Sequence, residues 1–308
     1  MSTGVAAVLF AVSLAATLYA ASVFADRLDH LGARLGLPEG ILGLLTALGA
    51  DAPELATAIA ALAAGSSSVG FGVVVGSNVF NLAAMIGVSA LLCGRVRITR
   101  DALALEGGAA LAVTVAMVLL AFGVLPAWAV LAVASAVLVP YAVIAFRREL
   151  GDPRVHSEHV PSRTFVLIPP SLAVIVLGSV GMVHTGIRLG HAAGIPDVLI
   201  GTLVLAVVTS MPNAYTGVRL GLARRGSALV SETLNSNTIN LVGGLAIPAL
   251  FVTVSGGGLA RADGVWLVAA TALTLVLLAS RGGVRRGGGV LLVASWVAFA
   301  IVQGVVGG

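Results

Sequence analysis

Residues 48–81 read LGADAPELATAIAALAAGSSSVGFGVVVGSNVFN and carry the features from which the fold is predicted. A second copy, VVTSMPNAYTGVRLGLARRGSALVSETLNSNTIN, occupies residues 207–240. Four residues of the first copy recur 159 positions later without a gap: Pro53, Ser77, Asn78 and Asn81 reappear as Pro212, Ser236, Asn237 and Asn240. Each copy places a proline and polar groups inside strongly apolar sequence. Interrupted apolar segments at matching places in two halves of a chain indicate the binding site of a transporter.

The composition around these copies is that of a membrane protein. Apolar residues make up 58% of the 308 residues, charged residues only 10%, and the mean hydropathy is +1.08. Most apolar segments approach the roughly 20 residues that a membrane-spanning helix needs. We predict an all-α polytopic membrane protein with ten transmembrane helices, at residues 4–25, 37–64, 69–92, 102–123, 126–146, 164–183, 196–222, 228–254, 262–280 and 289–306.

These helices divide into two halves. Residues 1–148 hold five helices, residues 149–163 form a short polar linker, and residues 164–308 hold five more. Because each half has an odd number of helices, the second half enters the membrane the opposite way up, which predicts two inverted five-helix repeats. Pro53 and Pro212 lack a backbone N–H, so we expect the second and seventh helices to be broken.

The arginines predict the orientation. All 17 basic residues are arginine, and the predicted helices place 15 of them on one side, with Arg188 and Arg261 on the other. By the positive-inside rule the central loop is cytoplasmic and both termini lie outside.

Asp51 and Glu54 are the strongest candidates for chemistry. They are three residues apart in the second helix, so they share one face. A carboxylate near the bilayer centre costs at least ~2.5 kcal/mol, which makes an intramembrane acid a functional hypothesis by default. Two adjacent acids cannot both ionise at low cost without a cation, so the pair binds a cation or a proton. We expect both carboxylates to face Asn213 and the third and eighth helices.

Polar residues at helical spacing could complete such a site. Ser77 and Asn81 are four apart, as are Ser236 and Asn240. Their oxygens suit a hard cation, but small polar residues at this spacing also serve close helix packing, and both interpretations remain open. Glu232 precedes Ser236 by four and extends the stripe, or it is a solvated residue near the cytoplasmic end of the eighth helix.

Other functional classes have little support. The chain contains no H-E-x-x-H, G-x-S-x-G, P-loop or cysteine cluster, so we do not expect an enzyme or a cofactor. The expected partners are membrane lipid and small inorganic cations, with no nucleic acid. The sequence does not indicate the oligomeric state.

The motifs resemble those of a known family. A-P-E-L at residues 52–55 and G-S-N-V-F-N at residues 76–81, with their inverted second copy, resemble the alpha repeats of the sodium/calcium exchanger family. That family belongs to the calcium/cation antiporter superfamily. The resemblance covers the ten-helix layout, with its specific motifs in the second, third, seventh and eighth helices. It implies that these four helices surround a midplane site and that the first and sixth slide across them.

The resemblance also implies an activity and a set of ligands. It implies exchange of Na⁺ or H⁺ against Ca²⁺ or a related cation, in a divergent member of prokaryotic type in the plasma membrane. Glu54, Ser77, Asn81 and Ser236 fall at positions that are ligands in the family. The second repeat keeps the family residues Thr209 and Ser210.

Departures from the family pattern concern the acids. The pair before the first P-E is A-D, ending at Asp51, where the family usually has T-S. The acid expected after the second proline is replaced by Asn213, and Asn240 stands where some members have an acid. Glu232 stands where the family motif has asparagine. The acids are therefore redistributed, with two on the second helix, which favours a monovalent or proton-coupled exchanger.

We therefore expect a secondary active cation antiporter that works by alternating access. One alternative is a monovalent cation/proton exchanger without Ca²⁺ transport. A second, from a different class, is a cation channel, which would conduct without a counter-ion.

Overall fold

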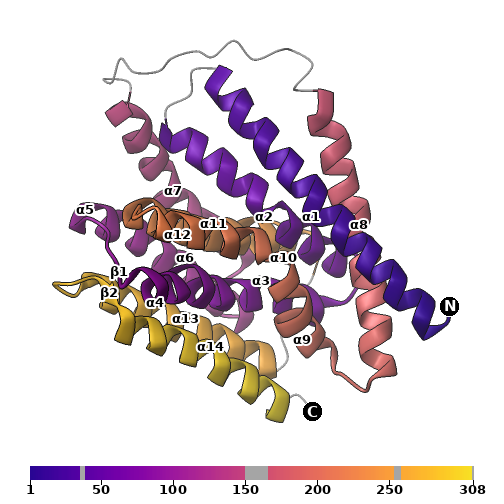
Figure 1. Ribbon diagram of the computed structural model, residues 1–308. Coiled ribbons are helices and arrows are strands. Elements are labelled where there is room, and N and C mark those ends of the chain that lie inside the picture. The colour runs from indigo at the N-terminus through magenta and orange to yellow at the C-terminus, as the bar shows by residue number, and fades with distance from the viewer. Residues whose placement is uncertain (35–38, 150–165, 253–257, 307–308) are drawn as a thin grey trace.

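The computed structural model describes residues 1–34, 39–149, 166–252 and 258–306. Apart from two strands of two residues each, the described elements are helices (Figure 1). The α-helices of the first half are α1 (Thr3–Arg34), α2 (Glu39–Ala63), α3 (Ser67–Asn81), α4 (Ser89–Cys93), α5 (Arg100–Ala102), α6 (Gly108–Ala121) and α7 (Ala127–Glu149). Those of the second half are α8 (Ile168–Ala192), α9 (Asp197–Leu199), α10 (Ala206–Thr209), α11 (Met211–Leu222), α12 (Gly226–Leu241), α13 (Gly258–Ala279) and α14 (Arg286–Val306).

Short π-helical and 3₁₀ segments join several of these helices end to end. They are η1 (Leu82–Val88), η2 (Leu103–Gly107), η4 (Ile200–Leu205), η5 (Val242–Ala246) and the 3₁₀ turn η6 (Pro248–Leu250). Each joined run corresponds to one predicted transmembrane segment, so the expected layout of about ten helices is confirmed across the described residues. By length and apolar composition, six described helices qualify individually as membrane spans, and the bent pair over 197–222 qualifies jointly. The predicted linker, 149–163, lies almost entirely outside the described residues.

The two prolines act differently. Pro212 follows a break at Ser210, where the run 197–209 and α11 are bent by 48°. The predicted break in the second helix is wrong, because α2 continues as one helix through Pro53. A proline in a helix removes one hydrogen bond and can be accommodated by a kink. At Ser210 the backbone leaves the helical region, with φ −82° and ψ 0°, and the helix restarts with Pro212 in its first turn, where a missing N–H costs nothing.

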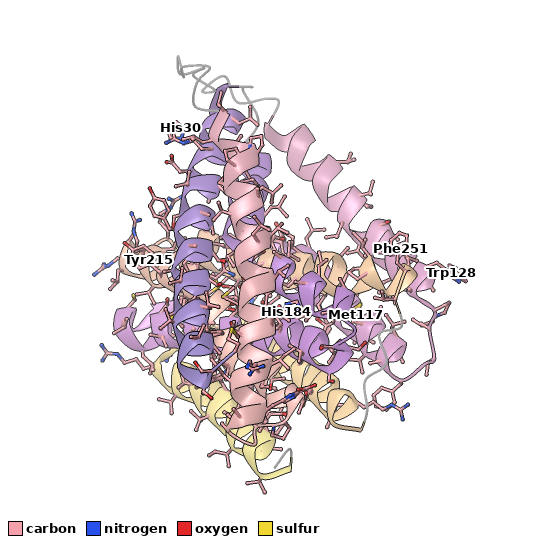
Figure 2. The ribbon with its side chains drawn as sticks, turned by 90° about the vertical axis from the view of Figure 1, so that its right-hand side faces the viewer. His30, Met117, Trp128, His184, Tyr215 and Phe251 are labelled. Atoms are coloured by element: carbon pink, nitrogen blue, oxygen red, sulfur yellow. The ribbon has the colours of Figure 1, made fainter. Side chains whose placement is uncertain are left out.

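The centre of the molecule is formed by the two copies of the repeated stretch. The span Ser67–Cys93, formed by α3, η1 and α4, is buried along its whole apolar window, as expected for a helix surrounded by others. Two glycines let this span cross η4, which belongs to the predicted seventh helix, at close range. A Cβ at Gly76 would lie 2.3 Å from the Thr202 carbonyl oxygen, and one at Gly201 would lie 2.5 Å from the Val69 carbonyl oxygen. Outside this centre, α1 and α8 lie side by side as two long helices (Figure 2).

The repeat is visible in local geometry. A π-helical segment follows the S-N-x-x-N motif in both halves, η1 directly after Asn81 and η5 one residue after Asn240. Such segments are rare and often occur at functional sites. The strands β1 (Arg95–Val96) and β2 (Val284–Arg285) form an antiparallel ladder that joins a loop of one half to a loop of the other.

Candidate cation-binding site

The two predicted acids meet the second repeat through one amide. Asn213 on α11 donates from Nδ2 to Asp51 Oδ1 at 2.7 Å and to Glu54 Oε1 at 2.9 Å. The same nitrogen lies 3.3 Å from Ser236 Oγ on α12, and the Ser236 hydroxyl donates to Asp51 Oδ1 at 2.5 Å. The acids therefore face Asn213, as expected, and three helices from both repeats share one polar network.

A second layer continues this network into α3. Asn81 donates from Nδ2 to Ser236 Oγ at 3.4 Å and to Asn237 Oδ1 at 3.2 Å. Asn240 donates to Asn78 Oδ1 at 3.4 Å. Sequence-related positions in the two repeats thus lie next to one another, which is the arrangement expected around a pseudo-twofold axis.

Asn78 and Asn237 are residues whose role the sequence analysis missed. Asn78 Nδ2 donates to the Asn237 carbonyl oxygen at 2.9 Å, and Asn237 Nδ2 donates to the Asn78 carbonyl oxygen at 3.0 Å. The two residues are 159 positions apart, so the exchange is symmetric between repeats. Their alignment in the two copies was the available signal. Reciprocal side-chain to backbone bonds tie α3 to α12 and hold the polar residues of both helices in register.

The site is closed to solvent and rich in unpaired oxygen. Asp51, Glu54, Asn81 and Asn240 are 0% exposed, and Asn213 and Ser236 are 1% exposed. Five buried oxygens here lack a hydrogen-bond partner: Asp51 Oδ2, Glu54 Oε2, Asn81 Oδ1, Asn213 Oδ1 and Asn240 Oδ1. A buried polar atom without a partner costs free energy unless something else binds it. Carboxylate, amide and hydroxyl oxygens are the ligands that hard cations take.

The remaining predicted residues lie near this centre with other partners. Ser77 Oγ donates to the Val74 carbonyl oxygen at 3.1 Å, and Thr209 Oγ1 donates to that of Leu205 at 2.8 Å. Both hydroxyls are fully buried, and their lone pairs remain able to accept or to ligate. Ser210 lies beside Glu54 at the helix break. The buried Thr57, one turn after Glu54, also has an unpaired hydroxyl and was not predicted.

Glu232 is placed apart from the hydrogen-bonded centre. It is half-buried on α12, one turn before Ser236, and it interacts electrostatically with both Asp51 and Arg225. No hydrogen bond among the described residues joins it to the other candidates. The structure brings it toward the site, between the acids and the arginines at the start of α12.

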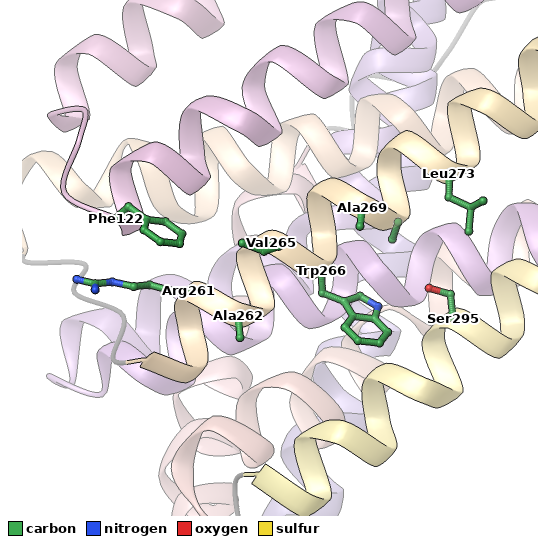
Figure 3. A pocket seen from close by; sticks show the side chains of 9 residues that line it. Phe122, Arg261, Ala262, Val265, Trp266, Ala269, Leu273 and Ser295 are labelled. Atoms are coloured by element: carbon green, nitrogen blue, oxygen red, sulfur yellow. The ribbon is translucent and has the colours of Figure 1, made fainter.

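Two other intramembrane acids lie elsewhere. Asp263 on α13 accepts a hydrogen bond from Gln303 on α14, and Glu106 lies beside Ser231. A surface pocket contains none of the predicted site residues, and its lining includes Phe122, Arg261, Val265, Trp266 and Ser295 (Figure 3). Among the described residues no group of three or more His, Cys, Asp or Glu side chains could hold a metal ion, so the candidate site combines two carboxylates with neutral oxygens.

Comparison with known proteins agrees with this architecture. The family described as "Sodium/calcium exchanger protein" matches residues 5–148 and 164–305. The sodium/calcium exchanger MaX1 of Methanosarcina acetivorans is 25% identical over 277 residues, 75% of this chain and 79% of that protein.

Solved structures share the fold. The H⁺/Ca²⁺ exchanger CAX superposes with a TM-score of 0.75 at 14% identity, covering 97% of this chain and 82% of its own. The sodium-calcium exchanger NCX_Mj superposes with a TM-score of 0.66 at 19% identity, covering 98% and 99%.

Proposed function

Because the chain belongs to the sodium/calcium exchanger family, we propose that its two repeats exchange cations at the buried Asp51–Glu54 pair. The protein is an integral membrane cation antiporter of this family, not an enzyme. The observation that carries the site assignment is the network in which Asn213 and Ser236 join both carboxylates across the repeats.

The proposed ligands are the predicted residues whose oxygens surround that network. Asp51 and Glu54 supply the charge. Asn81, Asn213 and Asn240 contribute unpaired buried oxygens, and Ser210 and Ser236 contribute their hydroxyls. Ser77 and Thr209 are proposed as outer members of the same site. Glu232 is proposed to act on the approach to the site, since its position on α12 lies next to Asp51 and Arg225.

Exchange follows from competition for these oxygens. A cation and its coupling ion occupy the same carboxylates in turn, because both cannot be bound at once. A loaded pair is neutral or nearly so, and neutral groups pass an apolar helix surface at far lower cost than bare carboxylates. The long helices α1 and α8, which lie side by side and pack on α2, are the proposed moving elements.

The placement of both carboxylates on one helix favours a monovalent cation or a proton as one of the exchanged ions. Position 213 is an amide, so the second repeat brings no acid into the hydrogen-bonded centre. We propose exchange of Na⁺ or H⁺ against Ca²⁺ or another cation, with a monovalent cation/proton exchanger as the second candidate.

We also propose the division into repeats at 1–148 and 164–308, a cytoplasmic central loop, both termini outside, and a prokaryotic plasma membrane.

Flux in liposomes distinguishes these candidates. The purified protein is reconstituted, and gradients of Ca²⁺, Na⁺, K⁺ and H⁺ are imposed one at a time. Antiport predicts that the movement of one cation requires a second cation on the opposite side. Ca²⁺ flux driven by Na⁺ or H⁺ supports the first candidate, whereas Na⁺ or K⁺ flux driven only by H⁺ supports the second. Flux that needs no counter-ion would contradict both.

A further inference from the structure

Three loops that are far apart in the sequence meet at one edge of the molecule, and each brings exposed arginines. They are the loop containing β1, the turn between α11 and α12, and the loop containing β2 (Figure 1). We call the exposed arginines Arg95, Arg97, Arg224, Arg225, Arg281 and Arg285 of these loops the arginine junction.

The backbone contacts that form the junction are tight. Arg95 pairs with Arg285 and Val96 with Val284 in the β-ladder. Both valines are buried in the core, so the alternation of the strands turns both arginines outward. The third loop abuts the ladder, since a Cβ at Gly226 would lie 3.0 Å from both the backbone N and O of Arg97.

The arrangement concentrates six arginines, and the acid that interacts electrostatically with one of them is Glu232, which lies beside Arg225. Like charges directly opposite each other on paired strands are destabilising. The pKa of Arg95 is lowered from its ordinary value chiefly by the charge of Arg97, then by burial, with Arg285 contributing as well. In the described part of the chain, the carboxylates within ion-pair distance of a basic group are Asp26 and Asp197, and neither belongs to the junction.

Backbone strain at Arg224 gives an independent indication. Arg224 has φ +57°, in the left-handed region that side chains other than glycine rarely adopt. The equivalent turn of the first repeat, 159 positions earlier, has Gly65 at φ +80°. Glycine adopts this conformation without a steric penalty. The turn geometry therefore favours glycine at position 224. Because arginine occupies this position in spite of the conformational cost, we infer that its charge has a role. Strain of this kind concentrates at functional sites.

The junction lies at the ends of membrane spans. Spans end at Cys93 and Ala279 and begin again at Arg100 and Arg286, immediately beside the two strands. This level is that of the lipid headgroups, where arginine attracts anionic lipids. The planar guanidinium group presents a fork of N–H donors that can bind two oxygens of a phosphate group at once.

We propose that the arginine junction binds the phosphate of an anionic phospholipid headgroup, which links the β1 loop of the first repeat to the two loops of the second. The bound phosphate relieves the repulsion between the paired arginines and stabilises their contact. Neutral phospholipids bind more weakly because their own cationic headgroup is repelled by the cluster.

Native mass spectrometry and thermal unfolding test the proposal on the intact protein in neutral detergent. Equimolar phosphatidylglycerol and phosphatidylcholine are added. The wild type should retain phosphatidylglycerol preferentially and gain thermal stability from it. Arg224→Gly should weaken that preference about fivefold, and Arg95→Gln with Arg285→Gln about 25-fold, since each arginine contributes about as much as one basic residue near an anionic surface. Arg224→Gly also removes the backbone strain, so it should fold at least as well as the wild type.

Arg261→Gln is the matched control, because Arg261 is an exposed arginine remote from the junction, stacked near the Phe122 ring. It should keep the wild-type lipid preference. Equal retention of the two lipids by the wild type, or unchanged preference in the junction variants, would overturn the proposal. Stabilisation by inorganic phosphate alone, at the concentration of the lipid, would also overturn it, because the junction would then take a free anion.

Discussion

At the scale of single residues, Asn213 is the residue on which the site depends. Its amide nitrogen contacts Asp51, Glu54 and Ser236, so changes at these positions cannot act independently. The amide donates to one oxygen of each carboxylate and leaves Asp51 Oδ2 and Glu54 Oε2 unpaired for a cation. Position 213 therefore influences both the charge of the site and the geometry of its acids.

Glu54→Gln should abolish exchange while leaving the protein folded and inserted. The change removes one of two site charges, and the neutral Asn213 cannot replace it, while losing an intramembrane acid is not itself costly. We expect flux to fall at least about 100-fold. A misplacement of a reacting group by 1 Å can already cost about 100-fold in rate, and this change removes a charge altogether. Liposome flux and size-exclusion profiles measure the two properties. Glu106→Gln is the control, because Glu106 is a partly buried acid that is not among the hydrogen-bond partners of Asn213. Normal flux in Glu54→Gln would remove Glu54 from the site.

Asp51→Ser combined with Asn213→Glu should recover flux that either change alone impairs. The first change leaves one acid in the hydrogen-bonded centre, and the second adds a third acid that must remain protonated. The double variant keeps two acids and moves one from α2 to α11, so carboxylates from both repeats can surround a divalent cation. Na⁺ and Ca²⁺ flux of the four proteins at one pH measures the coupling. Purely additive losses would show that the two positions do not compensate for each other.

At the scale of elements, the site depends on how closely α3 approaches its neighbours. The reciprocal bonds between Asn78 and Asn237 connect α3 to α12. Glycine at position 76 allows α3 to touch the backbone of the seventh helix at Thr202. These contacts set the separation between the two repeats, and hence the distance that the side chains of the site must bridge.

Gly76→Ala should therefore destabilise the fold, whereas Gly108→Ala should not. The new methyl group at position 76 would lie 2.3 Å from a backbone oxygen, which cannot move without shifting a helix. Overpacking of this kind costs about 1–3 kcal/mol or more. A methyl group at position 108 meets nothing within 4 Å, and alanine favours a helix over glycine by about 1 kcal/mol. Thermal unfolding in detergent should separate the two variants. Equal melting temperatures would mean that the close crossing is not required.

At the scale of the whole molecule, orientation and repeat symmetry are linked. The proposed inversion of the repeats would place the turn after α2 and the turn after α11 on opposite faces of the membrane. The arginine junction lies on the face of the second turn, which the positive-inside rule assigns to the cytoplasm.

The single native cysteine allows a direct test of orientation. Cys93 lies at the end of α4, partly exposed and adjacent to the loop of β1. A membrane-impermeant maleimide should label it in inside-out vesicles and not in intact cells. Ala64→Cys in a Cys93→Ser background is the control, since Ala64 is exposed in the turn after α2 and should show the opposite pattern. Labelling of Cys93 in intact cells would invert the proposed topology.

The helices, the repeat and the acidic pair could all be predicted from the amino-acid sequence. Long apolar segments indicate membrane-spanning helices, and these segments can be counted in the sequence. Composition and spacing also reveal the two aligned copies and the placement of Asp51 and Glu54. Which side chains are in contact became evident from the three-dimensional structure. It made Asn213 the donor to both acids, placed Glu232 outside the hydrogen-bonded centre, and kept α2 continuous through Pro53. It also paired Asn78 with Asn237 and brought three arginine loops together. The physical reason is that spacing fixes the face of a helix on which a side chain lies, while hydrogen-bond partners depend on close crossings between helices distant in the chain.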